Sequence, residues 1–315
     1  MSAGGQGHGN KAVIAALLAN AAIAVAKFVG FLVTGSSAML AESVHSVADS
    51  GNQGLLLLGG KWAKKAADAE HPFGYGRERY FWGFVVALVL FSLGGLFSLY
   101  EGYHKLEEAG DGGELTAPLV AVGILLFAIV AEGLSFRTAV KLANTTRGEQ
   151  SWWRFVRTAK SPELPVVLLE DLGALIGLTL ALLGVAAAAL TGNLVYDALG
   201  TMAIGVLLLV IAAFLVFEMR GLLIGEGGTK KQVAEIRRVL VDDDGVVRVI
   251  HLKTLHIGPD ELLVAAKVAL APGLSVPEVA AAIDEAELRV RAAVPIARPI
   301  YLEPDLYRPE RAPTP

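Results

Sequence analysis

The chain has 315 residues, of which 54% are hydrophobic and 18% charged, against roughly 25% charged residues in an ordinary soluble domain. Its 27 Lys and Arg against 31 Asp and Glu leave a net charge of −4, which gives no basic excess for nucleic acid, and the absence of Cys excludes disulfides and thiolate metal sites. Several apolar runs reach the roughly 20 residues that a helix needs to cross a bilayer, so the composition predicts a polytopic membrane protein.

Six apolar segments predict an all-α bundle of six transmembrane helices over residues 12–225. We place the segments at 12–34, 36–60, 80–102, 117–143, 164–190 and 194–219. The second segment carries several polar residues, so it can cross the membrane only inside a bundle. Residues 1–11 are rich in Gly, show no signal-peptide cleavage site and are predicted to be disordered.

Lys and Arg gather in two of the links between these segments. The link 61–79 holds five of them and the link 137–160 holds six, whereas Lys105 is the single one in the link 103–116. The positive-inside rule therefore places the two basic links, and with them both termini, in the cytoplasm. Because the chain has no Arg- and Ser-rich start of the transit-peptide type, a bacterial inner membrane is the simpler expectation.

From about Glu226 to residue 307 the composition is that of a small soluble domain, and residues 308–315 are predicted to be a disordered tail. Ser275 and Glu278 have the spacing of a capping box, which predicts the start of a helix. The patterns predict, in order, a helix at 233–240, strands at 248–257 and 262–270, a helix at 275–293 and a strand at 300–303. This order predicts an α+β domain of the ferredoxin-like kind.

One wall of the second segment is polar. On a helical wheel its polar residues fall within an arc of roughly 100°; they are Glu42, His45, Asp49, Asn52 and Gln53. His45 and Asp49 stand at i and i+4, so an imidazole nitrogen and a carboxylate oxygen project from successive turns toward one point. This is the geometry of half a tetrahedral metal site. The alternative is that Asp49 only hydrogen-bonds His45 and helps to pack the bundle.

The fifth segment adds a second pair of acidic residues, Glu170 and Asp171. Carboxylates on two neighbouring helices repel each other unless protons, a Lys or a bound cation neutralise them. Lys27 lies in the middle of the first predicted span and is a candidate counter-ion, and Glu132 of the fourth segment is a candidate proton acceptor. Together these residues favour a cation site over purely structural polar packing.

Two stretches resemble the cation diffusion facilitator family of divalent-metal transporters. The stretch from Thr34 to Asp49, Thr-Gly-Ser-Ser-Ala-Met-Leu-Ala-Glu-Ser-Val-His-Ser-Val-Ala-Asp, resembles the family signature in the second transmembrane helix, and His71 to Arg79 resembles its motif at the entry to the third. Six helices and a cytoplasmic ferredoxin-like domain are similar too. The resemblance implies a transporter and not an enzyme. It would be a homodimer that exports zinc or related ions from the cytosol in exchange for protons, with no cofactor besides the transported cation.

The resemblance implies that His45, Asp49 and Asp171 are metal ligands. The usual fourth ligand of the family is a His four residues before the aspartate, where this chain has Val167. Glu170, Asn52 or water then completes the shell, with Glu42 and Glu132 as further candidates for metal or protons; an oxygen-rich site also accommodates Mn²⁺, Fe²⁺ or Co²⁺. The Leu-Leu-Glu-Asp pattern resembles a mitochondrial zinc-transporter branch, which favours Zn²⁺.

Two further pairs of residues are candidates for metal outside the spans. Relatives of this kind sometimes carry a metal site near His71 and Asp68, although Pro and two Gly in the same motif are also typical of a structural turn. His251 and His256 lie five residues apart in a predicted strand and so on opposite faces. We therefore expect packing or surface roles for them.

The expected mechanism is alternating access, in which the metal displaces protons from the intramembrane ligands and external protons later displace the metal. Two alternatives stay open. An intramembrane metalloenzyme is disfavoured because the chain lacks His-Glu-x-x-His. A passive channel is distinguished by a flux that ignores the proton gradient. Gly95, Gly173 and Gly177 permit the close helix contacts that rocking motions use.

Overall fold

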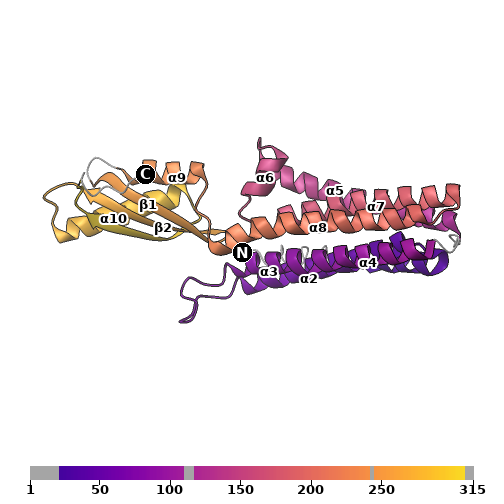
Figure 1. Cartoon of the computed structure of the whole chain (residues 1–315). Coiled ribbons are helices and arrows are strands. Elements are labelled where there is room, and N and C mark those ends of the chain that lie inside the picture. Colours follow the sequence, from indigo (N-terminus) through magenta and orange to yellow (C-terminus); the bar gives the residue numbers. More distant parts are fainter. Residues whose placement is uncertain (1–20, 110–116, 242–244, 309–315) are drawn as a thin grey trace, which may run out of the picture. The chain divides into compact units, whose positions relative to one another are not determined.

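The computed structural model describes residues 21–109, 117–241 and 245–308 (Figure 1). Two compact units divide the chain. The helical unit comprises the chain up to Gly59 together with Phe81–Arg157 and Pro162–Met219, and the sheet unit comprises Gly60–Tyr80, Thr158–Ser161 and the chain from Arg220 onward. The predicted disordered ends fall outside the described residues, apart from Arg308.

Helices make up most of the described part of the helical unit. The first described element is a helix, Ala21–Thr34. It is followed by α2 (Ser37–Trp62), α3 (Glu78–Val85), the π-helix η1 (Val86–Phe91), α4 (Ser92–Glu108), α5 (Pro118–Arg147), α6 (Trp152–Thr158), α7 (Glu163–Thr191) and α8 (Val195–Ile224). Residues 78–108, which include η1, run on as one helix of 31 residues.

Within the described residues, four helices are long and apolar enough to cross a membrane: Glu78–Glu108, α5, α7 and α8. These match four of the six predicted spans. The helix Ala21–Thr34 is apolar but has only 14 described residues, and α2 is interrupted by its polar wall. The six-span count therefore rests on the sequence pattern for the first two helices.

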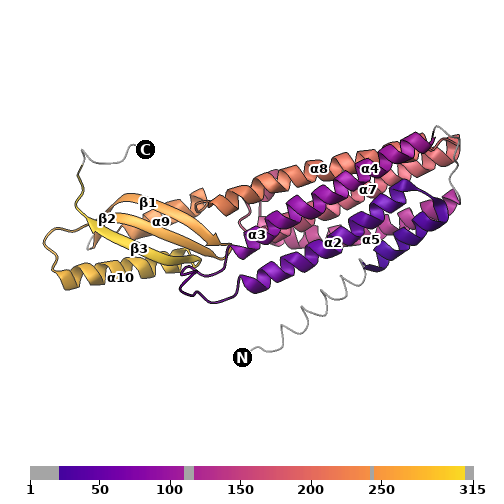
Figure 2. The same cartoon turned by 60° about the horizontal axis from the view of Figure 1, so that its bottom comes forward.

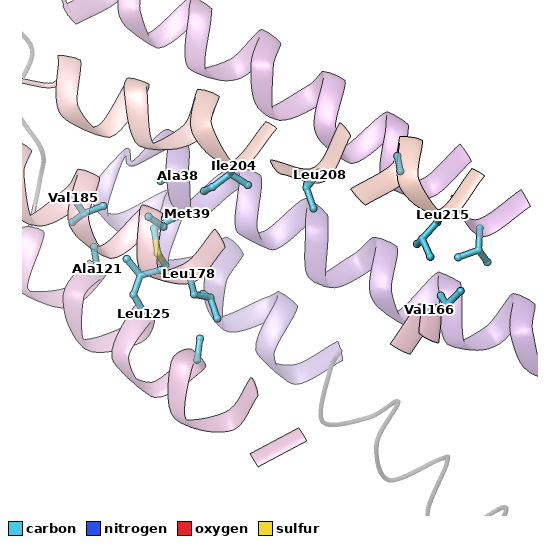
Figure 3. Close-up of a cluster of buried hydrophobic side chains, with 14 of the residues drawn as sticks. Ala38, Met39, Ala121, Leu125, Val166, Leu178, Val185, Ile204, Leu208 and Leu215 are labelled. Atoms are coloured by element: carbon cyan, nitrogen blue, oxygen red, sulfur yellow. The ribbon is translucent and has the colours of Figure 1, made fainter. Parts of the chain in front are cut away.

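Small residues hold the membrane helices close together. A Cβ added to Gly205 of α8 would lie 2.8 Å from the carbonyl oxygen of Gly95, so α4 and α8 touch backbone to backbone. A Cβ on Gly184 of α7 would likewise lie 2.9 Å from the carbonyl oxygen of Tyr196. Figure 3 shows an apolar core formed by other side chains of the bundle, with Met39 of α2, Leu125 of α5, Leu178 of α7 and Ile204 of α8 among them.

The sheet unit contains a small α+β domain in the predicted order α-β-β-α-β. Its elements are α9 (Lys230–Leu240), β1 (Val246–Gly258), β2 (Glu261–Leu270), α10 (Val276–Ala293) and β3 (Ala297–Asp305). The strands lie in the order β1-β2-β3, with β1 antiparallel and β3 parallel to β2 (Figure 2). The parallel pair needs a crossover, which α10 provides.

Capping boxes fix where both helices of this domain begin. The predicted box at Ser275 and Glu278 is present: the Ser275 backbone N–H donates to the Glu278 carboxylate at 2.7 Å. A second box at Thr229 and Gln232 opens α9. Side chains of α9 and α10, including Ile236 and Val290, then pack with Leu262 and Val264 of β2 in one core.

Candidate metal site

A buried ion pair connects the first helix to the polar wall of α2. The Lys27 ammonium lies 3.1 Å from Oε2 of Glu42 and donates a hydrogen bond to the Ser46 hydroxyl at 2.8 Å. Both charged side chains are fully buried. The predicted counter-ion role of Lys27 is thus confirmed, and its partner is Glu42.

Glu42 also touches α7. A Cβ added to Gly177 would lie 2.6 Å from Oε1 of Glu42, so glycine at this position leaves room for the carboxylate. Oε1 has no hydrogen-bond partner among the described residues. Glu42 therefore stands between a cation on the first helix and the backbone of α7, on the same wall as His45.

His45 and Asp49 meet on successive turns of α2, as the spacing predicted. Nδ1 of His45 lies 3.6 Å from Oδ1 of Asp49, and their side chains are 3% and 8% exposed. Two ligands about 2.0 Å from a tetrahedral zinc ion would be separated by roughly 3.3 Å. The pair is therefore almost at the spacing of two ligands of one ion. Oδ1 of Asp49 has no hydrogen-bond partner in the described part of the chain.

Asp171 of α7 is hydrogen-bonded to a serine of α5. The Ser135 hydroxyl donates a hydrogen bond of 3.1 Å to Oδ2 of Asp171 and so orients the carboxylate. Asp171 is 6% exposed, and its carboxylate acts on that of Asp49 more weakly than Glu132 and Glu42 do. Glu132 of α5, 8% exposed, interacts with both aspartates in the same way.

The described residues do not form a closed metal cluster in this conformation. No group of three or more His, Asp and Glu side chains among residues 21–109, 117–241 and 245–308 is placed to hold one ion. His45 and Asp49 are brought together, and Asp171 is their neighbour without joining them as a third ligand. The three-ligand set implied by the resemblance stays a prediction.

The candidates for the fourth ligand are Glu170 and Asn52. Glu170 of α7 is 2% exposed and Asn52 of α2 is 1% exposed. The Asn52 side chain interacts with the Glu170 carboxylate. Val167, at the position of the usual His, packs instead against an apolar cluster that includes Ala139 and Phe155. Within the described chain the surroundings of Val167 are thus apolar, while the polar groups lie near Glu170.

Charge is unbalanced among these helices. Five carboxylates are buried on α2, α5 and α7: Glu42, Asp49, Glu132, Glu170 and Asp171. Lys27 is the single buried Lys or Arg among the described residues. One pairing therefore leaves four buried carboxylates that protons or a bound cation must neutralise, since a lone buried carboxylate is unfavourable by several kcal/mol.

Asp197 caps a helix other than its own, which the sequence pattern did not predict. It lies near the start of α8, and its carboxylate accepts hydrogen bonds from the start of α2. The donors are the Ser36 hydroxyl at 2.7 Å, the Ser37 backbone N–H at 2.9 Å and the Ser37 hydroxyl at 3.1 Å. Asp197 thus caps α2 and is satisfied without a cation.

The candidate pair His71 and Asp68 lies in a hydrogen-bonded turn. Nδ1 of His71 is 3.6 Å from Oδ1 of Asp68, but the carboxylate already accepts hydrogen bonds from the Tyr75 hydroxyl at 2.6 Å and the Lys65 ammonium at 3.0 Å. These bonds, that from Tyr75 first, hold the pKa of Asp68 well below its usual range. The network supports the structural interpretation of this motif.

The same motif packs onto the β1–β2 turn inside the sheet unit. A Cβ on Gly76 would lie 2.8 Å from the carbonyl oxygen of Ile257 and 3.0 Å from Cα of Gly258, so the two backbones are in direct contact. Arg79 adds an ion pair of 2.8 Å with Asp260. The second glycine of the motif is therefore needed for close approach.

His251 and His256 differ in burial, as expected for residues on opposite faces of a strand. His256 is 1% exposed, and its Nδ1 lies 3.3 Å from the carbonyl oxygen of Gly258. Burial lowers the pKa of His256. His251 is half-buried in β1.

Comparison with known proteins agrees with this architecture. The chain matches the cation efflux transmembrane domain over residues 13–224 and the cytoplasmic domain of cation efflux proteins over residues 229–304. Among its relatives are the mitochondrial proton-coupled zinc antiporter SLC30A9 of Homo sapiens, 31% identical over 79% of this chain and 44% of that protein, and metal tolerance protein C4 of Arabidopsis thaliana, 30% identical over 80% and 55%.

A third relative, magnetosome protein MamB of Paramagnetospirillum magneticum, is 27% identical over 86% of this chain and 85% of its own length. The chain spans about half the length of the first two relatives. Four membrane-length helices and the match over residues 13–224 make it an integral membrane protein. The chain belongs to the cation diffusion facilitator family, with zinc-transporter-like relatives.

Proposed function

We propose that the protein is a secondary active exporter that moves a divalent cation, Zn²⁺ in first place, out of the cytosol in exchange for protons. The observation that carries this proposal is the excess of four buried carboxylates over buried Lys on α2, α5 and α7. Such a group binds either protons or a metal ion, which is the competition that an antiporter needs. The zinc antiporter among the relatives supports zinc as the cargo.

His45, Asp49 and Asp171 are the proposed ligands. The 3.6 Å spacing of His45 and Asp49 supports the first two, and the burial of the Asp171 carboxylate on the neighbouring α7 supports the third. A small inward shift of α7 toward α2 completes the site in this proposal. Glu170 or Asn52 then supplies the fourth ligand, and Glu132 receives a proton.

Transport follows from rocking of the helices around this site. Metal entering from the cytoplasm displaces protons from the ligands, the site opens outward, and external protons displace the metal. We propose six spans, the described helix Ala21–Thr34 and α2 completing the bundle, with both termini in the cytoplasm. The matched cytoplasmic domain supports a homodimer. Bacterial inner membrane stays a prediction, since some relatives are mitochondrial.

One observation favours a second cargo class within the same family. Val167 packs in an apolar cluster, so this position supplies no imidazole nitrogen, and the remaining candidates carry oxygen donors. An oxygen-rich shell accommodates Mn²⁺, Fe²⁺ and Co²⁺ more readily than a nitrogen-rich one. These ions are the alternative cargo.

Flux in proteoliposomes tests the proposal. We would measure uptake of Zn²⁺, Mn²⁺, Fe²⁺ and Co²⁺ with and without an imposed pH gradient. Asp49→Asn and Asp171→Asn are expected to abolish uptake, while the matched change Asp284→Asn on the exposed face of α10 leaves it intact. Full transport by both membrane variants would remove the site assignment, and flux that ignores the pH gradient would indicate a channel.

A further inference from the structure

The segment of residues 137–160, which we call the basic link, has no role in the proposed function. It holds six Lys and Arg against one acidic residue, Glu149. It includes the end of α5 and the short helix α6, and leads into α7, so it joins the ends of two membrane-length helices (Figure 1). Its charge therefore lies where a bilayer surface would be.

The helix α6 is fixed to the bundle. Phe155 is 5% exposed and packs with Ala139 and Ala143 of α5 and Leu168 of α7. The ring of Trp152 meets Phe155 edge to face, with 6.4 Å between centroids. A helix held in this way presents its other side chains in defined positions.

Two exposed tryptophans precede the buried Phe155 on α6. Trp152 is 40% exposed and Trp153 is 63% exposed, although Trp153 also stacks on Phe214 of α8 at 5.5 Å. Tryptophans at the ends of membrane helices sit at the level of the lipid headgroups, because the ring is apolar and its N–H is polar. Exposure of both rings at this place fits a lipid surface.

Each of the two tryptophan rings has one guanidinium group over it. That of Arg147 lies 4.3 Å from the centre of the Trp152 ring and is held by Asn144 at 2.9 Å, while that of Arg157 lies 5.7 Å from the Trp153 ring. Arg157 is 56% exposed and shares only its Nε with Glu218, at 3.3 Å. Arg154, also exposed, lies one turn before it on α6. Arginines bind phosphate oxygens through paired N–H groups.

We propose that the basic link is a binding site for anionic phospholipid headgroups of the cytoplasmic leaflet. Arg154 and Arg157 donate hydrogen bonds to the lipid phosphate, and Trp152 and Trp153 lie among the headgroups. The link holds six basic residues against one acidic residue. Lys160 has Glu226 as an ion-pair partner and Arg157 has Glu218, so the remaining excess of positive charge supplies the attraction. The site is separate from the carboxylates of the proposed transport site and does not depend on transport.

Lipid binding to the full-length protein tests this directly. In phosphatidylcholine vesicles, we would measure the fraction of spin-labelled phosphatidylglycerol and of spin-labelled phosphatidylcholine that the protein immobilises. Arg154→Gln combined with Arg157→Gln is expected to reduce the preference for phosphatidylglycerol by between about fivefold and about twenty-fivefold, since each basic residue near the surface contributes about fivefold. Arg154→Lys with Arg157→Lys keeps the charge and most of the preference.

The matched control changes the same number of arginines in the sheet unit: Arg237→Gln with Arg238→Gln, both exposed on α9. This control is expected to keep the lipid preference. An equal loss in the control, or no preference for phosphatidylglycerol in the unaltered protein, would overturn the proposal. Because the readout is lipid binding, a protein that binds lipid normally but moves no metal would count only against the transport proposal.

Fluorescence quenching gives a second readout of position. Trp62→Phe with Trp82→Phe leaves Trp152 and Trp153 as the only tryptophans of the chain's four. Lipids brominated near the headgroup end of the acyl chain are expected to quench this fluorescence more than lipids brominated near its methyl end. Equal quenching by both, or none, would place the rings away from the headgroups and contradict the proposal.

Discussion

Replacing Lys27 with Met tests how the bundle tolerates its buried carboxylates. Met keeps a long side chain but removes the single buried Lys or Arg among the described residues. Glu42 loses the ammonium group 3.1 Å away, and Ser46 loses its hydrogen-bond donor. A carboxylate that is fully buried then has no opposite charge beside it.

The magnitude follows from the distance and the burial. Two unit charges at 3.1 Å attract each other by about 5 kcal/mol at an effective dielectric constant of about 20. Removing one partner of a buried pair typically lowers stability by about 3–5 kcal/mol, because the other charge stays buried. We expect this loss in the free energy of unfolding for Lys27→Met. Adding Glu42→Gln removes the orphaned charge and should restore all but about 1–2 kcal/mol.

Reversible unfolding in mixed micelles, followed by circular dichroism across a titration with denaturing detergent, measures these differences. The two single variants and the double variant form a thermodynamic cycle. If the double variant is as unstable as the sum of the two single variants, the charges do not interact in the folded protein, and the reasoning about compensation among the buried carboxylates is refuted.

Three further predictions concern other contacts. Ser135→Ala should weaken metal binding about tenfold by freeing the Asp171 carboxylate, whereas Ser135→Thr should retain it; equal affinity in a zinc titration would contradict an orienting role. Gly76→Ala should detach the motif from Gly258, because the added Cβ would lie 3.0 Å from the Gly258 Cα, and increased amide exchange in the β1–β2 turn would show this. Burial lowers the pKa of His256, so the unfolded state binds more protons and stability should fall as pH drops below about 6.5; thermal melts of His256→Gln should lack that component.

Local patterns were enough to predict much of the secondary structure and the pairing of His45 with Asp49. The i, i+4 spacing of His45 and Asp49 determines a shared face, because helix periodicity alone sets it. The two strands at 248–257 and 262–270 and the box at Ser275 lie in the sheet unit in the predicted order. In each case the information lies within a few residues of the chain.

Contacts between distant segments were beyond such patterns. The hydrogen bonds from Ser36 and Ser37 to Asp197 join residues about 160 positions apart, and no local pattern of the sequence connects positions so far apart. Ser135 was missed for the same reason, since a serine in an apolar span carries no signal of its own until α7 is placed beside α5. Helix α6 was not predicted because its seven residues, about two turns, are too few to show a hydrophobic period.

The three hydrogen bonds that Asp197 accepts set where the bundle can bend. They join the starts of α2 and α8, and separating these ends would strip a fully buried carboxylate of its donors. The starts of α2 and α8 are therefore held together by these hydrogen bonds. Any swing of α2 that carries His45 and Asp49 is a rotation about that pivot, and its amplitude increases toward Trp62, where α2 ends.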